Sequence, residues 1–156
     1  MTDLAAELKP LLAAYETCWS TCKPSALRQL WHADETAPYY VAEEMTAPML
    51  SWQDITPYWA EAEKILKRFS IRTWNLNCKM IGPNLAALQF MMHWNAVLTG
   101  LDPTPIGLDV KVFTMAEKTP GGWKFRHAYI ESPVGALPYI KSIYKTNVDK
   151  DFLTER

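Results

Sequence analysis

The order of the periodic segments constrains this chain more than any other feature of its sequence. Apolar residues recur at helical spacing before Phe69, whereas strand-like runs follow from residue 70 to about residue 131. Strands that follow one another directly are joined by hairpins and need no crossover helices. The order therefore predicts an α+β fold with an antiparallel sheet rather than a doubly wound parallel sheet.

The expected helices leave two boundaries open. An amphipathic helix is expected over residues 3–22, and Pro10 either kinks it or marks its true beginning. A short second helix is expected over 26–31. The third helix begins after Ser51, which forms a capping-box pattern with Asp54, or at Thr56 with Pro57 in the first turn.

The strand pattern completes the expected fold. Strands are expected at 38–42, 70–81, 85–99, 107–116 and 123–131. A length of 156 residues predicts one domain over 1–156, with a core at about 5–133 and a C-terminal tail over 134–156 that carries a short helix near 137–144. Apolar residues on both sheet faces, and a charged fraction of only 21%, predict that a second copy covers part of one face as a homodimer.

The last strand carries the main candidate for chemistry. By the period of two, Trp123, Phe125, His127, Tyr129 and Glu131 share one face, and pairing with 107–116 makes that face the inward one. His127 would then lie on an apolar floor with Glu131 toward the rim, as a general acid or base near neutral pH. The alternative is a core histidine that is hydrogen-bonded to a tyrosine or a carbonyl group.

The long strand at 85–99 has large side chains on both faces, and the pattern does not decide which face is inward. His93 and Asn95 share one of these faces, so they line either the pocket or the outer surface. Tyr15 lies on the apolar stripe of the first helix, where its hydroxyl either donates to a developing oxyanion or is satisfied within the core.

Further aromatic residues are candidates for substrate binding. They are Trp19, Tyr39, Tyr40, Tyr58, Trp59 and Tyr129. Tyr39 and Tyr40 face opposite ways, so one of them is expected to face inward. Glu43 and Glu44 are interpreted as solvated side chains rather than as paired carboxylates.

Composition and missing motifs exclude several classes of function. A net charge of −1 gives no indication of a basic surface that would bind nucleic acid or an anionic membrane. The apolar stretch at 85–101 is too short and too polar to span a bilayer. The three cysteines lack disulfide or zinc spacing, and no phosphate loop, zinc motif or nucleophile elbow occurs. No metal and no cofactor are therefore expected. Asp3 stands where a signal peptide would be basic, which predicts a cytoplasmic protein.

Residues 5–133 resemble the nuclear transport factor 2-like superfamily, in its ketosteroid isomerase-like and SnoaL-like (polyketide cyclase-like) branch. The segment Gly121-Gly122-Trp123-Lys124-Phe125-Arg126-His127-Ala128-Tyr129 is similar to the closing strand of that family. Pro48 and Ser51-Trp52-Gln53-Asp54-Ile55 are similar to the segment that enters its third helix. The resemblance implies a cone-shaped curved sheet, antiparallel or mixed, with helices in its concave face, a blind apolar pocket and a dimer.

The resemblance also implies roles for particular residues. Tyr15 falls at the position of the oxyanion-binding tyrosine of ketosteroid isomerases, and Tyr39 or Ala42 at that of their catalytic carboxylate. Neither is a carboxylate, so that mechanism is not expected. Tyr15, Tyr39 or Tyr40, His93 and His127 instead resemble, in residue type, the tyrosine and histidine set of scytalone dehydratase.

These observations lead to two hypotheses. The first is a cofactor-free enzyme that isomerises, cyclises or dehydrates a small apolar or aromatic carbonyl or hydroxyl compound. His127 would transfer the proton, while Tyr15 and either Tyr39 or Tyr40 would orient the substrate oxygen. The second is a non-catalytic module that binds a ligand or dimerises. Loss of turnover in a His127→Ala variant would separate them.

Overall fold

The computed structural model describes residues 3–100, 103–135 and 137–149. The end of the expected C-terminal tail, residues 150–156, lies outside the described residues. Within the described ranges, no helix is both long enough and apolar enough to cross a membrane.

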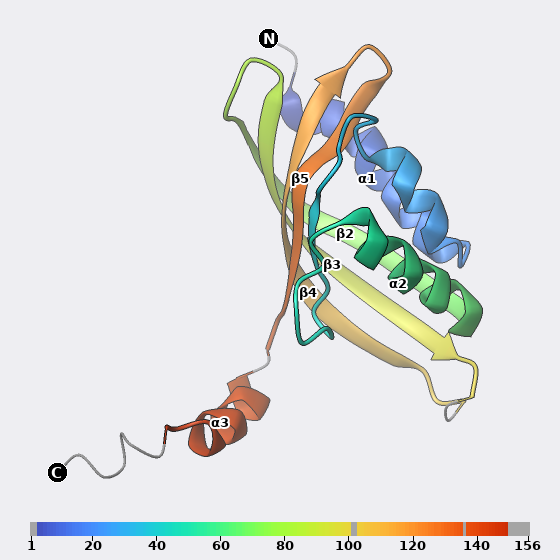
Figure 1. The fold of residues 1–156 in the computed structure, drawn as a ribbon, viewed down its shortest axis with the longest axis vertical. Coiled ribbons are helices and arrows are strands. Elements are labelled where there is room, and N and C mark those ends of the chain that lie inside the picture. The colour runs from blue at the N-terminus through green and yellow to red at the C-terminus, as the bar shows by residue number, and fades with distance from the viewer. Residues whose placement is uncertain (1–2, 101–102, 136, 150–156) are drawn as a thin grey trace, which may run out of the picture.

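Helices lead and strands follow, as the sequence predicts (Figure 1). The elements are α1 (Leu4–Ser20), the 3₁₀ helix η1 (Pro24–Leu30), β1 (Tyr39–Val41), α2 (Trp52–Ile65), β2 (Leu66–Met80), β3 (Leu85–Leu98), β4 (Ile106–Thr119), β5 (Gly122–Pro133) and α3 (Leu137–Thr146).

The five strands form one curved, mixed sheet in the order β1-β5-β4-β3-β2. Strands β2 to β5 pair antiparallel with their neighbours along the chain, whereas β1 runs parallel to β5. Figure 1 shows α1 and α2 on the same side of the sheet, and α3 apart from them beyond the end of β5. The predicted α+β class, with N-terminal helices packed against a curved mixed sheet, is confirmed.

Side-chain hydrogen bonds lie at the beginnings of α1 and α2. The Asp3 side chain accepts a hydrogen bond of 3.0 Å from the Ala5 N–H and caps α1, so that Pro10 lies inside the helix. Helix α2 begins after Ser51, the first of the two expected boundaries. The Asp54 carboxylate accepts hydrogen bonds from the Leu50 N–H and the Ser51 hydroxyl, at 3.1 and 3.0 Å.

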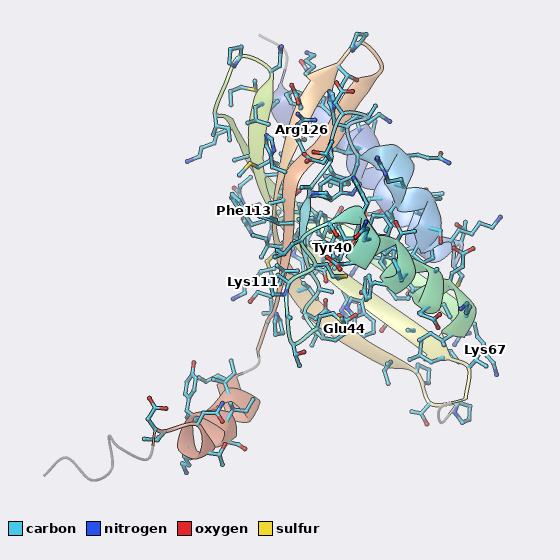
Figure 2. The ribbon with its side chains drawn as sticks, in the orientation of Figure 1. Tyr40, Glu44, Lys67, Lys111, Phe113 and Arg126 are labelled. Carbon is cyan, nitrogen blue, oxygen red and sulfur yellow. The ribbon has the colours of Figure 1, made fainter. Side chains whose placement is uncertain are left out.

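The inward face of β3 is now fixed. Leu88, Phe90 and Met92 are buried on the face that meets the helices, so His93 and Asn95 lie on the opposite face. Figure 2 shows Phe113 of the neighbouring strand β4 projecting away from the helices as well. The outer face of the sheet therefore carries both polar and apolar side chains.

The expected inward direction of His127 is wrong, and a β-bulge is the reason. Arg126 pairs with Met115, but the next pair joins Tyr129 to Thr114, so His127 and Ala128 are extra residues in β5. His127 has a left-handed φ of 62°, and its side chain is 53% exposed. Because the bulge contains two residues, the alternation resumes in phase, and Tyr129 and Glu131 still point inward.

Candidate functional site

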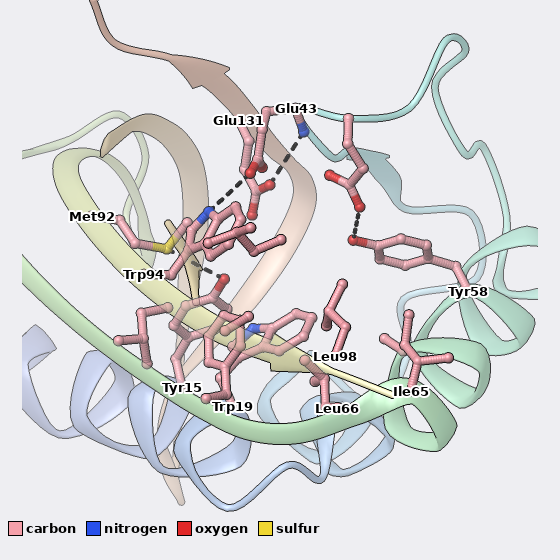
Figure 3. Close-up of a pocket in the computed structure, with 16 residues that line it drawn as sticks. Tyr15, Trp19, Glu43, Tyr58, Ile65, Leu66, Met92, Trp94, Leu98 and Glu131 are labelled. Atoms are coloured by element: carbon pink, nitrogen blue, oxygen red, sulfur yellow. Dashed lines mark hydrogen bonds between the residues drawn. The ribbon is translucent and has the colours of Figure 1, made fainter. Parts of the chain in front are cut away.

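A pocket of about 310 Å³ lies between α1, α2 and the inner face of the sheet, and Figure 3 shows the side chains around it. Its volume is at the lower end of the range of roughly 300–1,000 Å³ that is usual for small-molecule sites. The residues that line it are mostly apolar or aromatic. They are Tyr15, Trp19, Glu43, Glu44, Tyr58, Ala62, Ile65, Leu66, Phe69, Ile71, Met92, Trp94, Ala96, Leu98, Ile106 and Glu131.

Carboxyl groups gather on one wall of this pocket. Glu131 comes from β5, and Glu43 and Glu44 come from the segment that follows β1. The parallel pair Val41–Ile130 brings these two segments side by side. The Glu43 N–H donates to Glu131 Oε2 over 3.4 Å, and one carboxylate oxygen from each of the three residues lies within 4.8 Å of the others. This spacing is also short enough to hold a metal ion.

Glu131 is the buried member of the cluster, with 8% of its surface exposed. Burial raises the pKa of its carboxyl group well above the ordinary value. The side chain of Glu43 raises that pKa further by hydrogen bonding and by charge, and the charge of Glu44 adds to the effect. Glu131 therefore keeps its proton at pH values at which an exposed glutamate is ionised.

Two aromatic donors hold the other carboxylates in place. The Trp94 indole donates a hydrogen bond of 2.9 Å to Glu43 Oε1, and the Tyr58 hydroxyl donates one of 2.7 Å to Glu44 Oε1. Burial raises the pKa of Tyr58, with the charge of Glu131 as the next cause, so this hydroxyl remains a donor. These hydrogen bonds therefore fix the orientation of the Glu43 and Glu44 carboxylates at the pocket wall.

Tyr15 places a hydroxyl group inside the pocket. This hydroxyl donates to a weak acceptor, the thioether sulfur of Met92 at 3.7 Å. Its ring stacks on Tyr129, which stacks in turn on Tyr40, with both centroid distances at 5.3 Å. Burial raises the pKa of Tyr15, and the charges of Tyr129 and Glu131 add to this effect. The hydroxyl therefore keeps its proton, and its weak contact with the Met92 sulfur can be replaced by a stronger acceptor.

The predicted site residues fall into three groups in the structure. Those that line the pocket are Tyr15, Trp19, Tyr58 and Glu131. Those buried in the core without lining the pocket are Tyr40, Trp59 and Tyr129. Those that lie outside it are Tyr39, His93, Asn95 and His127.

The residues outside the pocket have other surroundings. Tyr39 is exposed, and its neighbour Tyr40 is the inward member of the pair. His93 lies on the outer face of the sheet, where its Nδ1 is 2.7 Å from Asp109 and its Nε2 is 3.2 Å from Asn95. His127 packs beside the buried carboxylate of Glu35, at an Nδ1–Oε2 distance of 3.5 Å. Of the described histidines, none lines the pocket.

Sequence reasoning included Glu131 but missed Glu43 and Glu44 as pocket residues. Both were expected to be solvated rather than paired; Glu44 is exposed as expected, yet both line the pocket beside Glu131. They lie next to Ala42, one of the two positions that the family resemblance gave for a catalytic carboxylate. The parallel pairing of β1 with β5 brings them to the pocket, and no local pattern in the sequence predicts that pairing.

No protein-family model and no curated protein matches the sequence, whereas known structures match the fold. A candidate scytalone dehydratase from Novosphingobium aromaticivorans superposes with a TM-score of 0.71 at 13% identity, covering 83% of each chain. A candidate dehydratase of the nuclear transport factor 2-like family from Streptomyces avermitilis gives a TM-score of 0.71 at 15% identity, covering 83% of this chain and 96% of that one.

A nuclear transport factor 2-like superfamily protein from Salmonella enterica serovar Typhimurium gives a TM-score of 0.68 at 16% identity, covering 83% of this chain and 94% of that one. At these identities the likeness concerns the fold. The curved mixed sheet, the helices on one of its faces and the agreement with these structures show that this chain has the nuclear transport factor 2-like fold.

Proposed function

We propose that this chain binds a small, largely apolar carbonyl or hydroxyl compound in the pocket and catalyses an isomerisation, cyclisation or dehydration by proton transfer. The observation that carries the proposal is the buried carboxyl group of Glu131, at the wall of the pocket and beside Glu43. A carboxyl group whose pKa is raised by burial and by a neighbouring carboxylate is a common form of catalytic acid.

The geometry supports a division of roles among three side chains. Glu131 carries the proton and acts as the general acid toward the substrate oxygen. Tyr15 donates a hydrogen bond to the same oxygen, because Tyr15 lines the pocket and the Met92 sulfur is a weak acceptor for its hydroxyl. Glu43 is held by the Trp94 indole and acts as the general base toward a carbon–hydrogen bond.

These roles give a balanced reaction. Glu43 takes a proton from the carbon next to a carbonyl group, and the electron pair of that bond forms the carbon–carbon double bond of an enol. The carbonyl oxygen receives the proton of Glu131. In an isomerisation, Glu43 then returns its proton to a different carbon, while Glu131 takes back the O–H proton of the enol and the carbonyl group re-forms. In a dehydration, Glu43 passes its proton to the hydroxyl group on the next carbon, which leaves as water, while Glu131 takes back the O–H proton and an enone is formed.

The structures with a similar fold are compatible with this proposal, but the proposal does not depend on them. Two of them are named as candidate dehydratases, although each is less than 20% identical to this chain. The proposal replaces His127 as the proton-transfer group, because its imidazole lies outside the pocket. It keeps the expected class of reaction and the expected role of Tyr15.

Hydrogen–deuterium exchange tests proton transfer without knowledge of the natural substrate. A panel of cyclic enones, aryl ketones and hydroxyketones is incubated with the protein in D₂O, and loss of the signal next to the carbonyl group is followed by NMR. The proposal expects faster exchange for at least one compound. It also expects that exchange to fall by a factor of about 100 or more in Glu131→Gln.

A matched control is Glu61→Gln, which removes an exposed carboxylate on α2 and should exchange like the unchanged protein. Exchange at the full rate in Glu131→Gln contradicts the proposal. A panel compound that binds in the pocket but shows neither exchange nor turnover instead supports the non-catalytic ligand-binding role.

The homodimer and the cytoplasmic location remain part of the proposal. Phe113 and Ile130 are cross-strand neighbours, and both are exposed on the outer face of the sheet. A second copy that covers them would explain this apolar surface. Phe113→Lys should then shift a dimer toward monomer in sedimentation velocity, whereas a chain that is already monomeric contradicts the prediction.

A further inference from the structure

The charge of the pocket is unbalanced. The carboxylates of Glu43 and Glu44 lie on its wall beside the protonated Glu131, and the described residues that line it include no lysine, arginine or histidine. Within the described part of the chain, none of the ion pairs involves these three side chains. Hydrogen bonds from Trp94 and Tyr58 orient two of the carboxylates but do not neutralise them. A compound that brings a positive charge would remove this imbalance.

Aromatic rings surround the same space. The ring centroids of Trp19 and Phe69 are 5.2 Å apart, and Phe69 stacks on Trp94 at a centroid distance of 5.9 Å. These three rings therefore form a continuous part of the pocket lining. Tyr58 adds a fourth ring beside Glu44. Aromatic faces attract organic cations, and quaternary ammonium groups in particular bind within such cages. Anionic side chains and aromatic faces therefore favour the same kind of ligand.

A buried donor in the pocket has no acceptor. Trp19 is 7% exposed, and its indole N–H lacks a hydrogen-bond partner among the described residues. Figure 3 shows this indole beside Tyr15, whose hydroxyl donates to a weak acceptor, the Met92 sulfur. A buried donor without a partner is unfavourable, so it marks the place where a ligand atom would accept. The ligand is expected to carry an oxygen acceptor at this place.

We propose that the pocket takes an organic cation: an apolar or aromatic compound with an amine or quaternary ammonium group near Glu43 and Glu44, and an oxygen acceptor for the Trp19 N–H and the Tyr15 hydroxyl. This rests on the proposed function, in that it names the ligand of the same pocket. A positive nitrogen also makes a neighbouring carbon–hydrogen bond more acidic, which assists the proton transfer assigned to Glu43.

Phenacyltrimethylammonium and its neutral isostere test the charge directly. In the isostere a tert-butyl group replaces the trimethylammonium group, so shape and carbonyl group are kept. Isothermal titration calorimetry at low salt should show the cation binding at least about tenfold more tightly. Benzoylpropionate, which carries a negative charge, should bind more weakly than either. Equal affinity for the cation and the isostere overturns the inference.

Variants assign the preference to particular side chains. Glu44→Gln changes an exposed carboxylate, which should not impair folding, and it should reduce the preference for the cation by a factor of about 3 or more. Glu61→Gln should leave the preference unchanged. Trp19→Phe keeps an aromatic face but loses the N–H, so it should weaken the binding of the cation and of the neutral ketone alike. An unchanged preference in Glu44→Gln contradicts the assignment.

The outcomes separate this inference from the proposed function. If neutral ketones undergo deuterium exchange but the cation has no advantage, the proposed function stands and the ligand class is wrong. If the cation binds with the expected preference but no compound exchanges, the ligand class stands and catalysis is wrong. Stoichiometric binding of Mg²⁺ or Mn²⁺ at the carboxylates, with exclusion of the organic cation, overturns the inference in favour of a metal site.

Discussion

The carboxylate of Glu35 accepts a hydrogen bond of 2.8 Å from the backbone N–H of His127. This bond lies at the bulge in β5, where His127 has its left-handed φ. Glu35 is buried, and it also contacts Arg126 at 3.5 Å and accepts from the Ala37 N–H at 3.3 Å. The bulge that turns the imidazole away from the pocket is thus held by a buried carboxylate from the loop before β1.

Removal of this carboxylate should destabilise the fold. Glu35→Ala removes the acceptor of the part-buried His127 N–H and one partner of the Arg126 guanidinium, at an expected loss of about 2–3 kcal/mol in the free energy of unfolding. Glu117→Ala is the matched control, because Glu117 also contacts Arg126, at 3.2 Å, but is more exposed. The control should lose less than about 1 kcal/mol. Equal losses in urea denaturation would contradict this role for Glu35.

The backbone at His127 gives a second prediction. A residue with a Cβ atom in the left-handed region costs roughly 1 kcal/mol, and glycine does not bear this cost. His127→Gly should therefore be at least as stable as the unchanged protein and more stable than His127→Ala. Thermal unfolding of the three proteins measures this order. A His127→Gly variant less stable than His127→Ala would show that the backbone is not strained there.

The same variants also test the placement of the site. Since the imidazole lies outside the pocket, both should catalyse deuterium exchange at the rate of the unchanged protein. A large loss of exchange in His127→Ala would restore the role that the sequence suggested for this residue.

The sequence predicts the fold well because its periodic segments are long. The apolar stripe of α1 and the hairpins that join β2 to β5 depend on local spacing, and both occur where they were expected. The C-terminal end of α2 was harder to predict, because β2 begins at Leu66, directly after the last helical residue, and no turn sequence separates the two elements. The inward face of β3 could not be predicted either, because both of its faces carry large apolar side chains.

The candidate site was harder to predict for two physical reasons. The period-of-two rule placed His127 inward, and a bulge with two extra residues cancels that rule locally while leaving Glu131 in phase. Glu43 and Glu44 follow a strand of three residues, and they reach the pocket through a parallel pairing with β5 that spans about 90 residues of sequence. Tyr15 was predictable because helical spacing alone directs it inward.

Tyr15→Phe isolates the hydroxyl in the pocket. This hydroxyl donates to the Met92 sulfur, a weak acceptor, so its loss should change the free energy of unfolding by less than about 1 kcal/mol. The rate of deuterium exchange should fall by a factor of about 100, as when a donor to an oxyanion is removed. Exchange at the full rate in a folded Tyr15→Phe variant would exclude this donor from the mechanism.

Stability should depend on pH through Glu131. Its pKa is raised in the folded state, so above the ordinary value of 4.5 the folded protein binds more protons than the unfolded chain. The free energy of unfolding should then fall as the pH rises from that value toward the folded-state pKa of Glu131. Glu131→Gln stays neutral and should flatten this slope in urea denaturation at a series of pH values. An unchanged slope in the variant would contradict the raised pKa.

The most direct measurement of the central claim is the titration of Glu131 itself. Carbon NMR of protein labelled at the glutamate carboxyl carbons, with the Glu131 signal assigned by its absence in Glu131→Gln, gives the pKa of this group in the folded state. The buried position beside Glu43 predicts a titration well above the ordinary range of glutamate. A Glu131 carboxyl carbon that titrates like an exposed glutamate would contradict the proton-carrying site on which the proposed function depends.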